Sequence, residues 1–211
     1  MDKYTKPNLG SSCLLTIDVQ NDFSLPGAVC EIKGTYDVIP NIVRLLEAYR
    51  LAGKPIIHVV RLYKGEGSNV DPCRRAKVEE GLNVVRPGSV GAELADALKP
   101  SPDVRLDADK LLEGRVQEIA ENEFIIYKPR WGAFYNTPLE KKLRELDVDT
   151  LVFCGCNFPN CPRTSIYEAS ERDFRLVLIG DAVSQLYDRG VEELKRIGVE
   201  VLNTKEFLRM L

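Results

Sequence analysis

The sequence predicts a single doubly wound α/β domain, in which a mainly parallel six-stranded sheet has helices on both of its faces. Short apolar segments alternate with amphipathic segments along most of the chain. The apolar segments are hydrophobic on both faces, as a parallel sheet covered by helices requires. The chain has 211 residues with 44% hydrophobic content, which suffices for one core. We therefore expect residues 1–211 to form one domain without an interdomain linker.

The expected strands are the short apolar segments, at residues 12–19, 54–63, 123–128, 149–155, 175–183 and 199–203. The expected helices are the amphipathic segments, at residues 37–53, 137–148, 162–174, 188–198 and 204–211. Leu139, Leu143 and Leu146 form one stripe of the second helix. Thr137 is expected to be the N-cap of that helix, since Pro138 follows it and suits the first helical turn.

One long segment, at about residues 63–107, interrupts the alternation between the second and third strands. It is rich in glycine, proline and charge, and it contains a possible helix at residues 89–98. A connection of this length inside a compact domain is often functional. Two interpretations remain open: a solvated excursion, and a lid or wall over a binding site.

The composition excludes several classes of partner. The formal net charge of −3 argues against binding to nucleic acid or to anionic lipid. The polar start "MDKYTKPNLGSS" does not look like a signal peptide, and no apolar run has the length of a membrane span. We therefore expect a cytoplasmic protein that acts on a small molecule. Structural disulfides are rare in that compartment.

Half of the six cysteines lie close together, at Cys154, Cys156 and Cys161. The spacing C-x-C-x₄-C lacks the second pair that a structural zinc site needs, and His58 is the only histidine. The other cysteines are scattered singly, at Cys13, Cys30 and Cys73. We therefore expect no metal and no cofactor, and the cluster favours a nucleophile with neighbouring bystanders.

Three reactive side chains are expected where strands end. Asp18 comes at the end of the first strand, Lys128 at the end of the third, and Gly155 leads from the fourth strand into a loop and a helix. Ligands of open parallel sheets bind beyond the carboxyl ends of the strands. An acid, an amine and a thiol are therefore predicted to meet at one edge.

The thiol is expected to be that of Cys161. Pro162 suits the first position of the following helix, which makes Cys161 the expected N-cap. A helix N-terminus and a nearby lysine both lower the pKa of a thiol. Cys154 is expected to pack inside its strand, and Cys156 lies too close to the turn to be well aimed.

Three stretches together resemble one family, namely "LLTIDVQNDF", "YKPRWGAFYNTPLEKKL" and "LVFCGCNFPNCPRTSIYEASERDFRLVLIGDAVS". They are similar to the isochorismatase-like cysteine hydrolases, over nearly the whole chain. The resemblance implies an Asp–Lys–Cys triad of Asp18, Lys128 and Cys161. It also implies a cis peptide bond between Cys156 and Asn157, with the backbone N–H groups of Asn157 and Cys161 forming an oxyanion hole.

The chain departs from the family pattern G-x-x-T-x-x-C-V, because Phe158 replaces the threonine and Pro162 the valine. The D-x-H metal motif of nicotinamidases is missing. The retained cysteine favours cleavage of a C–N bond in a small amide, carbamoyl or ureido substrate. The alternative is a family fold that no longer catalyses and serves as a small-molecule binding module. A dinucleotide-binding oxidoreductase is excluded because no G-x-G-x-x-G follows the first strand.

Four residues near the triad in sequence are candidates for substrate binding. Phe23, Trp131 and Tyr135 would form an apolar wall, unless they are ordinary core aromatics. Arg163 would grip a carboxylate on the substrate, unless an acid of the protein such as Glu168 binds it. The resemblance further implies a homo-oligomer, either a dimer or a tetramer.

Overall fold

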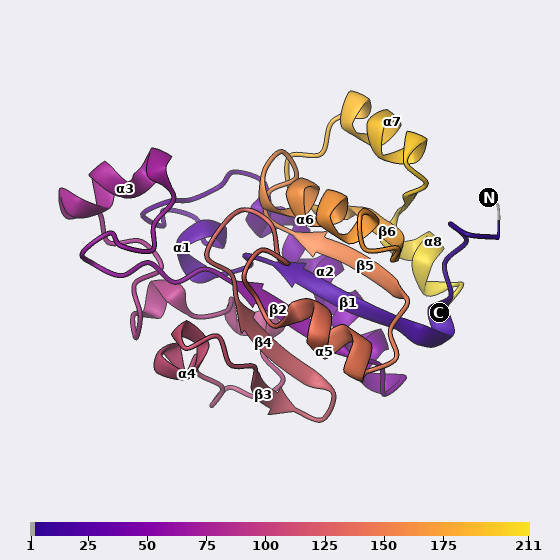
Figure 1. Ribbon diagram of the computed structural model, residues 1–211, viewed down its shortest axis with the longest axis horizontal. Coiled ribbons are helices and arrows are strands. Elements are labelled where there is room, and N and C mark those ends of the chain that lie inside the picture. The colour runs from indigo at the N-terminus through magenta and orange to yellow at the C-terminus, as the bar shows by residue number, and fades with distance from the viewer. Residues whose placement is uncertain (1–2) are drawn as a thin grey trace.

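The computed structural model describes residues 3–211 and confirms the predicted fold class, a single α/β domain (Figure 1). Its sheet has seven strands in the order β3-β4-β2-β1-β5-β6-β7. The strands are β1 (Ser12–Ile17), β2 (Ile56–Val60), β3 (Gln117–Ala120), β4 (Glu123–Tyr127), β5 (Thr150–Gly155), β6 (Arg175–Val183) and β7 (Glu200–Leu202). All neighbours pair in parallel except β3 and β4.

The order of the strands reverses between β1 and β5. From β1 the chain proceeds outward to β2 and β4, and from β5 it proceeds to β6 and β7 on the other side. The register pairs Ile17 at the end of β1 with Gly155 at the end of β5. Such a reversal leaves a crevice beyond the carboxyl ends of the two central strands, which is where ligands of these sheets bind.

Helices cover both faces of the sheet, and alternate strand residues point to each. The long helix α2 (Thr35–Leu51) packs with α8 (Thr204–Leu208) on one face, in a cluster that includes Leu14. The helices α5 (Leu139–Glu145), α6 (Cys161–Ser170) and α7 (Asp188–Arg196) lie on the other, in a cluster that includes Leu15. No helix among residues 3–211 has the length and apolarity of a membrane span.

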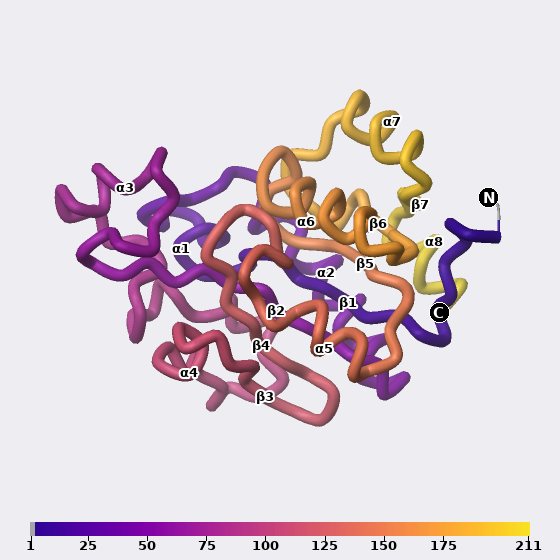
Figure 2. The backbone as a smooth tube through the Cα atoms, in the orientation of Figure 1, coloured from indigo at the N-terminus to yellow at the C-terminus, as the bar shows by residue number. Residues whose placement is uncertain are grey.

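The long connection between β2 and β4 packs at the carboxyl end of the sheet, where Figure 2 shows it extending away from the strands. It contains α3 (Pro72–Glu79), α4 (Ala108–Leu112) and two 3₁₀ turns at Val90–Ala92 and Asp96–Leu98. The remaining short elements are α1 (Asn21–Ser24) and a 3₁₀ turn at Leu9–Ser11. A third apolar cluster, which contains Phe23, Val78 and Leu111, anchors the connection to the sheet.

Three details of the predicted fold are wrong. The sheet has a seventh strand, β3, which escaped notice because it is a short, half-exposed edge strand without an apolar run. Residues 89–98 do not form a helix, because their carbonyl groups accept side-chain hydrogen bonds from the segment after β1. Pro138 rather than Thr137 is the N-cap of α5, although the Thr137 hydroxyl still accepts the Leu139 N–H.

A buried network ties β1, β2, β4 and α2 together in the sheet interior. His58, which is fully buried, contacts Thr16 Oγ1 at 2.7 Å and Glu123 Oε1 at 2.8 Å. Arg50 grips the same carboxylate with two hydrogen bonds of 2.9 and 2.7 Å. Burial alone would raise the pKa of Glu123, but the hydrogen bonds from Arg50 and His58 outweigh it and lower the pKa to about 2.

Glu123→Gln should therefore destabilise the protein by about 3 kcal/mol at pH 7, because it leaves Arg50 and His58 without their anion. The pKa of Glu123 is lower in the folded state, so its contribution is present above about pH 4.5 and is lost as the pH falls toward 2. Urea unfolding from pH 7 to pH 3 measures both effects. The control Glu113→Gln, at an exposed ion pair, should shift stability by less than about 0.5 kcal/mol. If the free energies of unfolding of Glu123→Gln and the wild type differed by the same amount at every pH, the lowered pKa of Glu123 would be contradicted.

Candidate active site

Three strand ends are locked in register at the crevice. The backbone N–H groups of Asp18, Lys128 and Cys156 each donate to a carbonyl of the neighbouring strand, at 2.9, 3.0 and 2.8 Å. These bonds continue the parallel ladders one residue beyond β1, β4 and β5. The predicted convergence of these strand ends therefore follows from sheet register.

Asp18 and Lys128 form a buried ion pair. Lys128 Nζ lies 2.8 Å from Asp18 Oδ2, and the two residues are 0% and 4% exposed. Asp18 adopts a left-handed backbone conformation with φ of 53°, which is uncommon outside glycine and occurs where a site needs it. The second oxygen, Asp18 Oδ1, is buried and has no hydrogen-bond partner among residues 3–211. One oxygen thus holds the lysine, and the other is free to accept a proton.

Cys161 is the first residue of α6, and its thiol lines the same cavity as Asp18. The prediction that it is the N-cap is off by one position. Asn160 is the N-cap, because its carbonyl accepts the N–H of Thr164 and thereby begins the helical bonding. Cys156 lines this cavity as well, although the sequence places it close to the turn.

The thiol of Cys161 does not have the lowered pKa that its helix position predicted. Burial raises its pKa, and the Asp18 carboxylate raises it further. Lys128 and Arg61 act in the opposite direction, and Arg61 Nη2 lies 3.9 Å from the sulfur. Because burial dominates, Cys161 rests as a thiol and needs a base to become a nucleophile. Burial also raises the pKa of Cys156, to about 12.

The loop between β5 and α6 begins at Gly155. Its φ is 116°, and a Cβ atom there would overlap the Ile17 backbone, so only glycine allows β5 to approach β1 this closely. The expected cis bond between Cys156 and Asn157 is wrong, because no peptide bond among residues 3–211 is cis. The backbone N–H groups of Asn157 and Cys161 donate to no acceptor within residues 3–211. They are therefore available to a ligand.

Phe158, which departs from the family pattern, is fully buried. Its ring meets Tyr187 edge-on, with centroids 5.3 Å apart. It also packs so closely on Gly190 of α7 that a Cβ atom there would overlap the ring. The missing side chain at Gly190 therefore makes room for the larger residue in the loop.

A cavity of about 10 Å³ lies over the thiol, which is room for about one water molecule. Phe23 and Trp131, two of the residues expected to bind a substrate, are among the residues that line it. The remaining lining residues are Asp18, Ile32, Arg74, Cys156, Asn157 and Cys161. Tyr135 is not among them and is 52% exposed.

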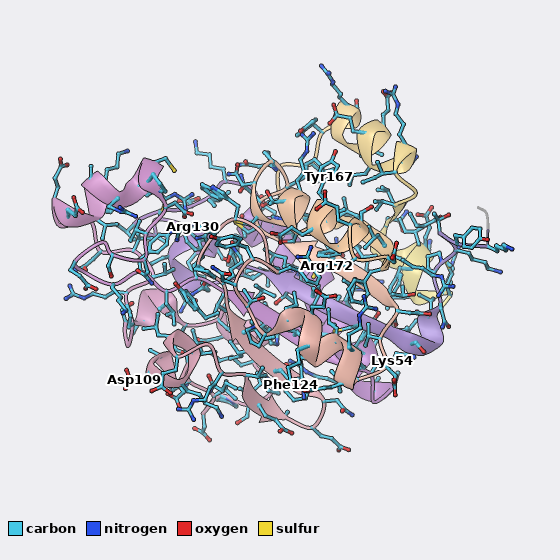
Figure 3. The ribbon with its side chains drawn as sticks, in the orientation of Figure 1. Lys54, Asp109, Phe124, Arg130, Tyr167 and Arg172 are labelled. Carbon is cyan, nitrogen blue, oxygen red and sulfur yellow. The ribbon has the colours of Figure 1, made fainter. Side chains whose placement is uncertain are left out.

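The structure also does not bring Arg163 to this cavity. Its guanidinium lies 2.6 Å from Glu193 and donates to the Tyr187 hydroxyl. The acid partner left open in the sequence analysis is thus Glu193 of α7, and not Glu168. Figure 3 shows Tyr167, whose ring Arg163 also approaches, on α6.

The polar residues after β1 fasten the long connection over the site. Gln20 exchanges two hydrogen bonds with the backbone of Arg61, at 2.7 and 2.8 Å, and donates to the Ala92 carbonyl at 2.6 Å. Asn21 donates to the Val90 carbonyl, and the Asp22 carboxylate accepts a backbone N–H at 2.6 Å. The motif "QND" thus links the first strand to the connection.

Sequence analysis missed a second buried ion pair, between Arg61 and Asp71. Arg61 Nη1 lies 2.9 Å from Asp71 Oδ2, both residues are 1% exposed, and the Tyr63 hydroxyl donates to the same carboxylate. Arg61 Nε has no hydrogen-bond partner among residues 3–211. The available signal was a cation directly after the apolar run "IIHVV", where a strand ends inside the protein. Within residues 3–211, no three His, Cys, Asp or Glu side chains are grouped to hold a metal ion.

These features define an α/β protein with a buried Asp–Lys pair beside a cysteine at a helix start. The isochorismatase domain family matches residues 12–112 and 105–206, and the chain belongs to this family. An isochorismatase family protein from Desulfovibrio vulgaris has the same fold, with a TM-score of 0.80 and 29% identity over 93% of this chain and 96% of that one.

Relatives in sequence carry functional descriptions of two kinds. A protein of Arabidopsis thaliana described as a probable inactive nicotinamidase is 32% identical, over 93% of this chain and 94% of its own length. The ureidoacrylate amidohydrolase RutB of Methylobacterium radiotolerans is 29% identical, over 90% of this chain and 72% of its own. The relatives thus include an amidohydrolase, in agreement with amide C–N hydrolysis, and also a protein thought to have lost activity.

Gly190→Ala tests the contact that supports the loop. Alanine is favoured over glycine in a helix by about 1 kcal/mol, yet we expect a net loss of about 1–3 kcal/mol because Phe158 must move. The double variant with Phe158→Leu should recover most of this loss, as thermal unfolding of the full cycle would measure. Gly180→Ala, where the nearest side chain is the flexible end of Leu186, is the control. If the stability losses of Gly190→Ala and Phe158→Leu simply added in the double variant, the contact between these two residues would be contradicted.

Proposed function

We propose that this protein is a cysteine-dependent amidohydrolase that cleaves the C–N bond of a small amide, carbamoyl or ureido substrate. The observation that carries the proposal concerns Asp18, which lines the same cavity as Cys161 and whose Oδ1 is buried without a hydrogen-bond partner among residues 3–211. A buried carboxylate oxygen without a donor is unfavourable unless it has a task, and accepting a thiol proton is such a task.

In the proposed reaction, Asp18 takes the proton of Cys161 and the sulfur attacks the substrate carbonyl. Lys128 and Arg61 lower the free energy of the developing thiolate, which burial alone disfavours. The N–H groups of Asn157 and Cys161 receive the oxyanion, and one such donor is typically worth about 3 kcal/mol in the transition state. The C–N bond then breaks, and protonated Asp18 gives its proton to the departing ammonia or amine.

A thioester between Cys161 and the acyl or carbamoyl group remains after this step. Water attacks its carbonyl while Asp18 accepts a proton from the water, and the carbon–sulfur bond breaks. The thiolate of Cys161 regains a proton, and the acid leaves. No step requires a metal or a cofactor. The amidohydrolase among the relatives supports this reaction class.

A second candidate is a small-molecule binding module that keeps the fold without turnover. The relative described as probably inactive and the substitutions Phe158 and Pro162 favour it. The two candidates differ in the reactivity of Cys161. An enzyme should react with iodoacetamide at Cys161 well before it reacts at the buried cysteines Cys13 and Cys154, and a substrate amide should slow that reaction while it is consumed.

Cys161→Ser should lower ammonia release from a panel of small amides, carbamoyl compounds and ureido acids by at least about a thousandfold. The unfolding temperature should change little, because the side chain keeps nearly its size. Cys156→Ser, the matched control in the same cavity, should keep most of the activity. If Cys156→Ser were inactive and Cys161→Ser active, the nucleophile would be Cys156 and the proposed assignment would be wrong.

Activity should not depend on added metal, because every proposed step uses side chains and backbone groups of the protein itself. Dialysis against a strong chelator, followed by the ammonia assay and elemental analysis, measures this. The rate should stay within about twofold of the untreated protein, a change of under 0.5 kcal/mol in the barrier. Loss of activity that zinc or iron restores would overturn the metal-independent reaction.

A further inference from the structure

A buried arginine stands behind the wall of the cavity and reaches the nucleophile from there. Arg61 is 1% exposed and is not among the residues that line the cavity. Its Nη2 donates to the Cys161 sulfur at 3.9 Å. Its guanidinium lies 5.2 Å from the centre of the Trp131 ring, which does line the cavity. The reacting atom within reach of Arg61 is therefore the sulfur.

Segments on three sides hold Arg61 in this place. Its backbone exchanges two hydrogen bonds with the side chain of Gln20, at 2.7 and 2.8 Å. Its Nη1 donates to the carbonyl of Pro129, the residue after Lys128, at 3.2 Å. The same Nη1 lies 2.9 Å from Asp71 Oδ2. The first two contacts are neutral, and Asp71 supplies the negative charge.

Asp71 is itself firmly anchored at the start of α3, which Figure 1 shows beyond the carboxyl ends of the strands. It is the N-cap of that helix, and its carbonyl accepts the N–H groups of Arg74 and Arg75 at 2.9 and 3.0 Å. The Tyr63 hydroxyl donates to its Oδ2 at 2.8 Å. Asp71 is 1% exposed, so its carboxylate exchanges little with water. A side chain held in this way can fix the position of its partner.

A buried guanidinium needs an anion, because it keeps its charge and loses its hydration. Burial alone would lower the pKa of Arg61, but neighbours that can carry a negative charge outweigh burial and raise it. These neighbours are Tyr63, Cys161, Asp18 and Asp71. Asp18 already binds Lys128 at 2.8 Å. Without Asp71, the carboxylate left for Arg61 would be that of Asp18, in competition with the lysine.

We propose that Asp71 is a positioning residue for the reaction, which holds the Arg61 guanidinium against the Cys161 sulfur and away from the Asp18 carboxylate. This rests on the proposed function, in which Cys161 is the nucleophile, and adds a residue of the long connection on which that nucleophile depends. Arg61 in this place favours the thiolate through its charge and a hydrogen bond. Asp18 Oδ1 stays free to accept the thiol proton.

The sign of the effect separates positioning from charge alone. A nearby carboxylate disfavours a thiolate, so loss of the Asp71 charge by itself would lower the pKa of Cys161 and speed its alkylation. Positioning predicts the opposite, because a released Arg61 no longer donates to the sulfur and the pKa of the thiol rises. The other ionisable groups that act on this thiol or line its cavity are the same in both cases, namely Asp18, Lys128, Cys156 and Arg74.

The test is the rate of alkylation of Cys161 by iodoacetamide, followed by mass spectrometry over a range of pH. Asp71→Asn should slow this reaction at least about tenfold at neutral pH, since one pKa unit changes the thiolate fraction tenfold. The midpoint of the pH profile should move upward. In an Arg61→Gln background, Asp71→Asn should change the rate less than about twofold, because the group that it positions is gone.

Asp96→Asn is the matched control, because Asp96 is an exposed acid of the same connection and its loss changes the net charge equally. It should leave the rate unchanged. The fully buried Cys13 and Cys154 report unfolding in every variant. Tyr63→Phe keeps the ion pair and removes only the hydroxyl that donates to Asp71, and it should slow alkylation about threefold.

Faster or unchanged alkylation in Asp71→Asn, or an equal effect with and without Arg61, would overturn the positioning role. If Asp71→Asn unfolds because Arg61 has lost its anion, an unchanged rate in Tyr63→Phe would overturn it instead. Alkylation needs no turnover, which separates this result from the proposed function. Slowed alkylation in Asp71→Asn of a protein whose wild type releases no ammonia would support the role of Asp71 and refute the amidohydrolase.

Discussion

The buried ion pair between Asp18 and Lys128 is the interaction on which the rest of the site depends. Neither charge is stable in the interior alone, because each would lose its hydration without compensation. They meet because the backbone N–H groups of Asp18 and Lys128, one residue beyond β1 and β4, both donate to carbonyl groups of β2, which holds the two residues in register. The arrangement leaves Asp18 Oδ1 without a hydrogen-bond partner among residues 3–211, and the proposed reaction uses this oxygen as the acceptor of a proton.

The same edge of the sheet also determines how the long connection folds. The side chains of Gln20, Asn21 and Asp22 form hydrogen bonds with backbone groups of residues 61–92. These bonds attach the long connection to the segment that follows β1. Near the start of this connection, Arg61 binds Asp71 at 2.9 Å. Arg74 of this connection is one of the residues that line the cavity beside Cys161.

Phe158, which departs from the family pattern in the loop between β5 and α6, changes the local packing without removing the backbone groups that the proposed reaction uses. Phe158 fills a place in the core opposite Gly190, and within residues 3–211 the backbone N–H groups of Asn157 and Cys161 donate to no acceptor. The loop therefore keeps the features that an oxyanion would need. The substitution at Phe158 is therefore a weak argument for a binding module.

The sequence by itself determined the fold class and the meeting of Asp18, Lys128 and Cys161, because apolar periodicity and the carboxyl ends of parallel strands follow from local pattern. It could not reveal β3, whose half-exposed edge has no such pattern, or the pairing of Arg163 with Glu193, which is 30 residues away. Nor could it give the raised pKa of Cys161 or the buried pairing of Arg61 with Asp71. These depend on burial and on contacts between distant segments, and only the tertiary structure decides which charges meet and which water is excluded.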